Sequence, residues 1–218
     1  MRTYPRELVR KWPCTSPHRV PRFRRIRADE IPAATIDLAK ALIGCVLVRD
    51  TSQGRAAGRI VETEAYVVGD PASHAYGGKS KRNASMFLGA HRAYVYKIYG
   101  TSFCVNVTSE GREEGAAVLI RALEPLEGVE LMEKRRKTAQ PRDLCRGPGR
   151  LCQALAIDGS LDGADLLRGR ELWLAAAADA RPRIGTSRRI GITKAAHRRL
   201  RFFERGSPYV SGPRHLSR

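Results

Sequence analysis

The chain has 218 residues, which suits one domain with a substantial core, and 42% of them are hydrophobic. No apolar run approaches the roughly 20 residues needed to cross a membrane, so a membrane-spanning protein is excluded. The 40 Lys and Arg residues outnumber the 22 Asp and Glu residues and give a net charge of +18, which favours a polyanionic partner such as nucleic acid. A structural nucleic-acid binder, or an arginine-rich proteome, would explain the same charge.

Residues 1–27 form a basic extension with nine Lys or Arg residues and four prolines. The prolines prevent a continuous helix and the apolar core of a signal peptide is absent, so we expect this extension to be disordered. It is either a basic arm that adds electrostatic affinity for nucleic acid or a solvated extension without such a role. An organellar transit peptide is a third interpretation, but it requires an amphipathic helix that the prolines break. The globular domain is expected to cover residues 28–218.

The first predicted elements of the domain are a helix and a strand. The helix covers Ala34–Ile43, with Thr35 as its capping residue and Gly44 as its stop signal. The strand, Cys45–Arg49, follows directly and is mostly apolar.

Two carboxylates lie in the next predicted strand, Gly58–Ala65, where apolar and polar residues alternate. In a regular strand Ile60, Glu62 and Glu64 point to one face, while the residues between them point to the other. Two acids on a partly apolar face indicate either a functional site with a raised pKa or a solvated strand end at which both acids pair with arginines.

A tyrosine-rich hairpin is predicted further along the chain. Its strands are Ala93–Ile98 and Phe103–Thr108, and a short glycine-containing turn joins them. Tyr94 and Tyr96 share one face of the first strand, and Tyr99 falls at the tip of the hairpin. A tyrosine at a tip leaves apolar area in water, so it either stacks against a nucleic-acid base or packs back on its own hairpin.

The rest of the chain alternates strands and helices. The predicted elements are a strand at Ala116–Ala122, a helix at Leu126–Lys137 started by Pro125, a helix at Arg150–Ile157, and strands at Glu171–Leu174, Arg189–Ile192 and Leu200–Phe203. The glycines before the second helix indicate either a phosphate site or plain helix capping. The order of elements predicts an α+β fold, a single domain with a mostly antiparallel mixed sheet, flanking helices and a protruding β-hairpin. The glycines fit no Walker or dinucleotide-binding pattern.

The five cysteines are odd in number, and no two have the Cys-x-x-Cys spacing of a zinc site. Cys45 and Cys104 fall within apolar strand patterns, where a free cysteine behaves as a small hydrophobic residue. We therefore expect a reduced cytoplasmic protein without a metal ion or other cofactor.

A set of motifs then occurs in order along almost the whole predicted domain. These are Ile60–Tyr66, His74, Arg82–Asn83, Met86–Phe87, Tyr94–Tyr96, Ile98–Gly100, Asn106, Arg121–Pro125, Leu151–Ala156 and Arg205–Ser211. Together they resemble the alkyladenine, or 3-methyladenine, DNA glycosylase family. The similarity runs from about Ile31 to Ser211, and residues 1–27 lie outside it.

The resemblance implies a monofunctional DNA repair enzyme that flips an alkylated or deaminated purine out of duplex DNA and hydrolyses its N-glycosidic bond, leaving an abasic site. It implies that Glu64 is the general base and that Glu62 is its structural neighbour. It also implies that Tyr66, His74 and Tyr96 are the rings that contact and sandwich the flipped base. Their electron-rich faces would attract a methylated, positively charged purine by cation–π contact.

Four further roles follow from the same resemblance. Tyr99 matches the side chain that enters the minor groove and fills the gap in the base stack. Asn106 matches the residue that clashes with the exocyclic amine of guanine, and Arg121 matches an arginine beside the attacking water. Ile190 matches the residue whose backbone carbonyl orients that water, although Arg183–Gly185 has a similar sequence and offers a second alignment.

The resemblance implies no catalytic lysine, so neither a Schiff base nor strand cleavage is expected. The expected partner is double-stranded DNA that contains damaged purines, and the enzyme is expected to be a bacterial, cytoplasmic monomer. A non-enzymatic basic DNA or RNA binder is the rival interpretation. It explains the charge but not an acidic strand coupled to a tyrosine-tipped hairpin.

Overall fold

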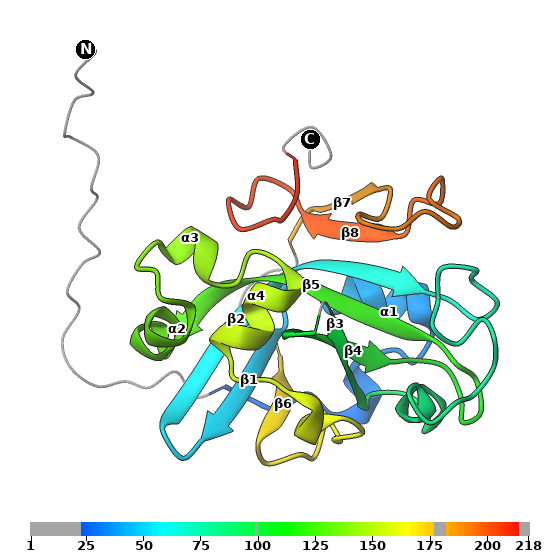
Figure 1. Ribbon diagram of the computed structural model, residues 1–218, viewed down its shortest axis with the longest axis horizontal. Coiled ribbons are helices and arrows are strands. Elements are labelled where there is room, and N and C mark those ends of the chain that lie inside the picture. Colours follow the sequence, from blue (N-terminus) through cyan, green and yellow to red (C-terminus); the bar gives the residue numbers. More distant parts are fainter. Residues whose placement is uncertain (1–22, 99, 177–181, 214–218) are drawn as a thin grey trace, which may run out of the picture.

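The computed structural model describes residues 23–98, 100–176 and 182–213. Within these ranges the centre of the molecule is one curled sheet of eight strands with short helices around it (Figure 1). The strands are β1 (Val46–Thr51), β2 (Gly54–Tyr66), β3 (Ala93–Ile98), β4 (Ser102–Thr108), β5 (Ala117–Glu127), β6 (Leu172–Ala175), β7 (Ile184–Ser187) and β8 (Arg201–Glu204). The helices are α1 (Thr35–Ala41), α2 (Val129–Arg136), α3 (Pro141–Leu144) and α4 (Pro148–Ala154), with 3-10 turns η1 (Ala28–Glu30), η2 (Ala84–Phe87) and η3 (Gly159–Leu161).

The strand order is β3-β4-β5-β2-β1-β6, and every pairing between these strands is antiparallel. The long strand β2 branches the sheet. Its first half pairs with β1, whereas residues Glu62–Glu64 pair with β8, which pairs in turn with β7. In Figure 1, β7 and β8 (orange and red) cross above β2 and β5. The predicted α+β fold with a mostly antiparallel sheet is confirmed.

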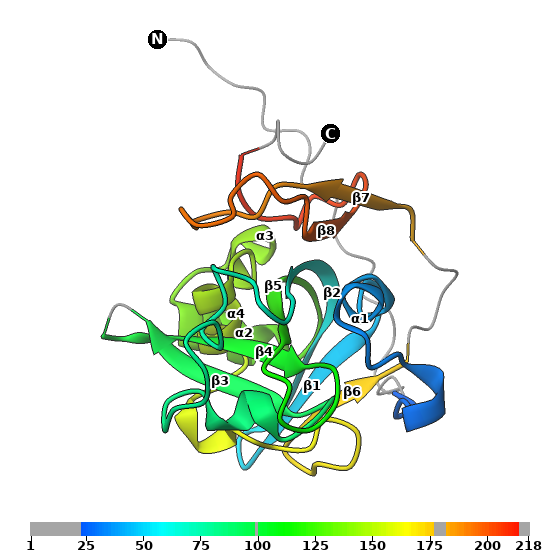
Figure 2. The same cartoon turned by 90° about the vertical axis from the view of Figure 1, so that its right-hand side faces the viewer.

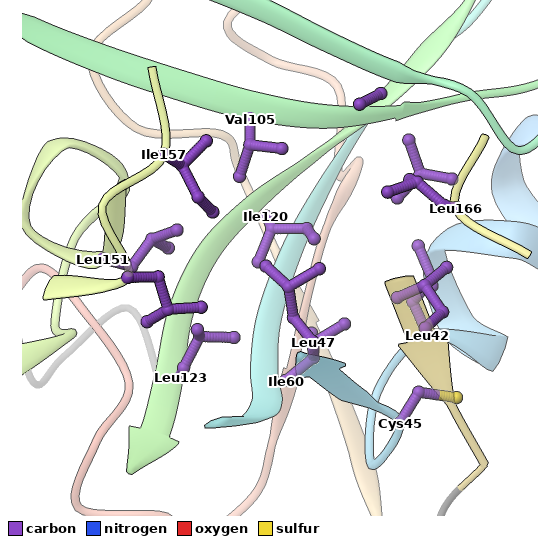
Figure 3. Packing of buried hydrophobic residues seen from close by; sticks show 14 of the residues in the cluster. Leu42, Cys45, Leu47, Ile60, Val105, Ile120, Leu123, Leu151, Ile157 and Leu166 are labelled. Carbon is purple, nitrogen blue, oxygen red and sulfur yellow. The ribbon is translucent and has the colours of Figure 1, made fainter. Parts of the chain in front are cut away.

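The main hydrophobic core lies between the sheet and the helices α1 and α4 (Figure 3). Leu42 directly after α1, Leu47 and Ile60 of the sheet, and Leu151 of α4 are fully buried in it. Burial of each such side chain contributes about 1.5–3 kcal/mol, so this face holds the sheet and helices together. A smaller cluster of Val61, Ala122, Phe203 and Val210 lies between the sheet and the C-terminal segment.

A register irregularity in β2 corrects the predicted placement of the two acids. The pairing of β2 with β5 shifts between Ile60 and Glu62, and again before Thr63. A bulge of this kind turns the strand about its axis. Ile60 therefore packs in the main core with Ala65, whereas Glu62 reaches Ser211 of the C-terminal segment. The prediction that both acids share a face with Ile60 is wrong.

The helix predicted at Ala34–Ile43 is confirmed as α1, but its cap differs from the prediction. Ala34 occupies the N-cap position and Thr35 is the first helical residue. The Glu110 carboxylate accepts a hydrogen bond from the Thr35 N–H at 2.8 Å and another from its hydroxyl at 2.5 Å. A carboxylate 75 residues away thus caps the helix.

The helix expected at Leu126–Lys137 begins later, as α2. β5 continues through Pro125, which lies opposite Gly58. The pairing of the two strands shifts register at this point, so the proline nitrogen does not need to donate a hydrogen bond to the neighbouring strand. Gly128 then ends the strand with a φ of +70°. A Cβ atom there would lie 2.2 Å from the Arg55 carbonyl oxygen, so only glycine fits this turn.

Two other predicted elements differ from the structure. Arg189–Ile192 is an irregular segment, and the strand of this region is β7 at Ile184–Ser187. The helix predicted at Arg150–Ile157 is confirmed as α4, but it starts at Pro148 and ends at Ala154.

The tyrosine-rich hairpin has the predicted strands, β3 and β4, which pair from Ala93↔Val107 to Ile98↔Ser102. Figure 2 shows this hairpin projecting from one side of the body. Tyr94 and Tyr96 share a face, as predicted, with ring centroids 5.2 Å apart. Tyr99 lies outside the described residues.

Residues 23–27, the last part of the predicted N-terminal extension, lie within the described chain and contact β6. Ile26 donates its N–H to the Leu174 carbonyl at 3.2 Å, and Arg25 forms a bridge with Ala175 of β6. Residues 1–22 lie outside the described residues. In the described part of the chain, no helix has the length and apolar character required to cross a membrane.

Candidate active site

A cavity of about 510 Å³ opens beside the base of the β3–β4 hairpin. Its walls come from the end of β2, the loop between β2 and η2, both strands of the hairpin, and the irregular segment after Arg189. Three of the ring-bearing residues that line it are Tyr66, His74 and Tyr96, the three rings predicted to hold a base. Its volume is within the range of small-molecule sites, roughly 300–1,000 Å³.

Glu64 is fully buried directly behind this cavity. Tyr66 donates its hydroxyl proton to Glu64 Oε2 at 3.0 Å, and Arg121 Nη1 donates to the same oxygen at 3.2 Å. The other oxygen, Oε1, accepts the Ile190 N–H at 2.7 Å. All three donors belong to residues that line the cavity, so the carboxylate lies one residue behind the cavity wall.

Glu62 is also fully buried, but its partners are structural elements. Its Oε1 accepts from Arg201 Nε at 2.6 Å and from Arg121 Nε at 3.1 Å, and its Oε2 accepts the Ser211 N–H at 2.6 Å. Arg201 also donates to the Ser211 carbonyl at 3.1 Å. Glu62 therefore holds the C-terminal segment onto the sheet. It also orients Arg121, which donates a second hydrogen bond to Glu64.

The electrostatic surroundings of Glu64 differ from those of an ordinary glutamate. Burial raises the pKa of its carboxyl above the usual 4.5, while Arg121 and the Ile190 N–H limit the rise because they stabilise the carboxylate. Burial, reinforced by the nearby Glu64, also raises the pKa of Tyr66. The tyrosine thus stays protonated and donates to Glu64. Raised pKa values of this kind are typical of catalytic carboxylates.

The part of the cavity wall that His74 and Tyr96 form is held by a residue that the sequence did not identify as functional. Tyr94 Oη lies 2.8 Å from His74 Nδ1 and fixes the orientation of the imidazole. The His74 ring stands nearly edge-on to Tyr96, with centroids 4.5 Å apart and an interplanar angle of 72°. Burial, together with the charge of Arg82, lowers the pKa of His74, which is therefore neutral at pH 7. Burial raises the pKa of Tyr94 to about 12.

Asn106 lines the cavity from β4 and is buried. Its amide Nδ2 donates to the Tyr94 carbonyl at 2.9 Å, across the pair that the two residues form in the β3–β4 ladder. The hairpin thereby fixes the amide in one position. A fixed side chain can exclude a ligand by its shape, as a mobile one cannot.

The structure distinguishes between the two possible alignments of the Arg-Ile-Gly sequence. Ile190 lies at Glu64, and its carbonyl oxygen is 3.5 Å from Arg121 Nη1. Ile184 instead belongs to β7 and packs against the main core. The geometry therefore favours Ile190, with its N–H on Glu64 and its carbonyl beside Arg121.

Two charged residues near the site were not identified from the sequence. Arg189 and Asp70 form a fully buried ion pair behind Tyr66. In the sequence, Asp70 occurs in a glycine- and proline-containing loop that reads as solvated, and Arg189 is one of many arginines. Neither position therefore carries a signal that would single it out.

Within the described residues, no three His, Cys, Asp or Glu side chains gather closely enough to hold a metal ion. Cys45, Cys104, Cys145 and Cys152 are buried and are not joined in disulfides. Cys104 lines the cavity opposite Tyr96 in the hairpin.

A family model described as Methylpurine-DNA glycosylase (MPG) matches residues 29–208. The chain belongs to this family. A Mesorhizobium japonicum protein with the provisional name 3-methyladenine DNA glycosylase is 56% identical over 191 residues, which cover 88% of this chain and 92% of the relative. The human DNA-3-methyladenine glycosylase is 45% identical over 204 residues, which cover 86% of this chain and 68% of the human protein. A similarly named protein of Methanoculleus marisnigri is 48% identical over 192 residues, 83% of this chain and 98% of the relative.

Membership of the methylpurine-DNA glycosylase family confirms the family predicted from the motifs. The matched region contains every residue for which the resemblance implied a role, from Glu62 to Ile190. Of the described residues among them, Glu62, Glu64, Tyr66, Arg121 and Ile190 form one hydrogen-bonded group, and His74, Tyr96 and Asn106 line the same cavity.

Proposed function

We propose that the protein is a DNA repair glycosylase that releases alkylated or deaminated purines from double-stranded DNA by hydrolysis of the N-glycosidic bond. The observation that supports this most directly is the buried carboxylate of Glu64, which is held by Tyr66, Arg121 and Ile190 behind an aromatic cavity. The site holds a general base just behind the wall of a cavity that suits a flat ring.

The rings define how a purine would be bound. A flipped base would enter the cavity that Tyr66, His74 and Tyr96 line, the rings for which the resemblance implies this contact. A methylated purine carries positive charge, and a ring face stacked on it contributes about 0.5–2 kcal/mol of cation–π stabilisation. Because the His74 and Tyr96 planes are 72° apart, only one of these two rings can stack face-on. Extrusion costs a few kcal/mol of stacking and pairing and costs least for damaged or poorly paired bases. Part of the selectivity therefore arises before the base reaches the cavity.

Loss of the base leaves an oxocarbenium-like sugar with developing positive charge. The Glu64 carboxylate stabilises that charge and takes a proton from the attacking water. A water bound between Arg121 Nη1 and the Ile190 carbonyl would lie within reach of Glu64, since both groups adjoin it. Arg121 keeps Glu64 ionised, and Glu62 keeps Arg121 in place.

The DNA is held by charge and by the hairpin. With a net charge of +18, phosphate contacts supply affinity that falls as salt rises. Tyr99 is proposed to enter the minor groove and fill the gap left by the flipped nucleotide. We propose that the enzyme acts as a monomer.

Release of free base from alkylated duplex DNA tests this function directly. A non-enzymatic basic protein would bind the same duplex and release nothing. Trapping with borohydride tests for a lyase, and we expect no covalent adduct because no Schiff base forms. Lys97 is the one lysine of the described chain that lines the cavity, so Lys97→Ala is the control for any adduct that does appear.

Discrimination against guanine is predicted to depend on Asn106. Replacement by serine or alanine removes the amide that occupies the cavity wall, so the exocyclic amine of guanine no longer meets it. We expect Asn106→Ser and Asn106→Ala to begin releasing normal guanine from undamaged duplex DNA. Quantification of free guanine by chromatography measures this, and an unchanged guanine rate would contradict the steric role.

The pH dependence is predicted to differ between neutral and cationic lesions. Excision requires ionised Glu64, so the rate rises with pH through the pKa of Glu64, which lies above 4.5. Hypoxanthine must also be protonated as it leaves, which adds an alkaline limb and makes the profile bell-shaped. For 7-methylguanine, which already carries its charge, the alkaline limb should be weak or absent. Single-turnover rates from acid to alkaline pH check this, and identical two-limbed profiles for both lesions would contradict it.

A further inference from the structure

A buried ion pair lies behind the tyrosine that is proposed to stack on the base. Arg189 Nη1 and Nη2 both bond the Asp70 carboxylate, the second at 3.1 Å from Oδ1, and both side chains are fully buried. The Arg189 guanidinium carbon is 4.6 Å from the centroid of the Tyr66 ring. Tyr66 lines the cavity and Arg189 does not, so the cation stands on the side of the ring that faces away from the bound base.

The same arginine is tied to the catalytic group through the backbone. Arg189 Nη1 also donates to the Ala65 carbonyl at 2.9 Å, between Glu64 and Tyr66. The next residue, Ile190, gives its N–H to Glu64. Arg189 therefore positions both the ring and the backbone segment beside the base-binding space.

Burial of two charges usually costs more than their attraction returns, so an apolar pair would serve packing alone equally well. The Arg189 Nε atom, moreover, has no hydrogen-bond partner among the described residues. The location of this costly pair, in contact with Tyr66, points to a role in the site.

The charge behind Tyr66 has a consequence for the ligand. A guanidinium under one face of an aromatic ring repels a cation stacked on the other face unless a carboxylate neutralises it. The cavity lining already carries Arg82, Lys97 and Arg121 and, among the described residues, no carboxylate. Any further uncompensated positive charge would therefore act against a methylated, cationic purine.

We propose that Asp70 is a specificity-determining residue, which neutralises Arg189 and so keeps the cavity face of Tyr66 attractive to cationic purines. This proposal rests on the proposed function, in which Tyr66 stacks on the flipped base. A base stacked about 4.5 Å from the ring centroid lies roughly 9 Å from the guanidinium, where an uncompensated charge weakens binding of a cation on the order of 10-fold.

The test compares two duplexes that differ only in the lesion, 7-methylguanine as the cation and hypoxanthine as the neutral base. The enzyme concentration that half-saturates single-turnover excision is measured for each. Asp70→Asn should raise this half-saturating concentration for 7-methylguanine about 10-fold relative to that for hypoxanthine. Asp70→Glu, which keeps the charge and disturbs the geometry, should leave that ratio within about 2-fold of wild type. Arg189→Gln, which leaves Asp70 as the uncompensated charge, should move the ratio in the opposite direction.

A purely structural role would change both lesions equally in every variant, and that result would overturn the proposal. An equal shift in Asp70→Asn and Asp70→Glu would overturn it as well, because geometry rather than charge would then be responsible. If Asp70→Asn does not fold, the Arg189→Gln variant tests the proposal alone, because its ratio between the two lesions should shift in the opposite direction. A wild-type enzyme that releases neither base would instead refute the proposed function.

Discussion

Glu64→Gln is expected to abolish base excision while DNA binding stays near that of the wild type. General-base catalysis is typically worth about 10²–10⁴-fold, and glutamine lacks both the charge and the basicity of the carboxylate. Glutamine keeps the size of the side chain, and its carbonyl oxygen can still accept the Ile190 N–H. Single-turnover release of 7-methylguanine, alongside a binding assay on the same duplex, measures the two effects. A loss of less than about 10-fold would contradict the assignment of Glu64 as the base.

The melting temperature separates this effect from misfolding. Because burial raises the pKa of Glu64, the stabilising contribution of this group is present below 4.5 and is lost as pH rises through the raised value. Glutamine does not ionise, so the variant should gain stability relative to wild type as the pH is raised from acid to neutral. Arg121 keeps Glu62 as its ion-pair partner in this variant, so an inactive variant that melts near the wild-type temperature at pH 7 has lost chemistry and not structure.

Glu62→Gln is expected to have its main effect on stability. The change removes a carboxylate that pairs with fully buried Arg201 and nearly buried Arg121. Removing one partner of a buried ion pair typically costs 3–5 kcal/mol, so the free energy of unfolding should fall by about that amount. Denaturation in urea measures it. The effect on the excision rate of the folded enzyme should be much milder than that of Glu64→Gln.

A matched control is available at the surface. Glu113 pairs with Lys79, and both side chains are largely exposed, so Glu113→Gln should cost at most about 1 kcal/mol. If Glu62→Gln costs no more than this control, Glu62 does not hold the C-terminal segment in the way described.

The hairpin was predictable because its signals are local. Alternation in Ala93–Ile98 and Phe103–Thr108, with a glycine in the turn between them, fixes the strands and the shared face of Tyr94 and Tyr96. The helix at Leu126–Lys137 was predicted to start too early because Pro125 is a common first helical residue. Here it fits a strand at a register shift, which depends on the partner strand.

The faces of β2 could not be predicted for the same reason. A bulge is a property of two paired strands, so the alternation of Ile60, Glu62 and Glu64 in the sequence gives no sign of it. The resemblance to the family identified the site residues even though the bulge in β2 was not predicted. Asp70 and Arg189, which are 119 residues apart, were missed because in a chain of charge +18 a single arginine is no signal.

The order in which the chain is synthesised bears on when the site can exist. Glu62 and Glu64 are made early, whereas Ile190, Arg201 and Ser211, which bond them, are made 126 to 149 residues later. A domain generally folds as a unit, and synthesis proceeds at about 5–20 residues per second. The two acids therefore lack these partners until the later segment has been made. A nascent chain without that segment would have no assembled catalytic centre and would also lack Phe202 of the main core.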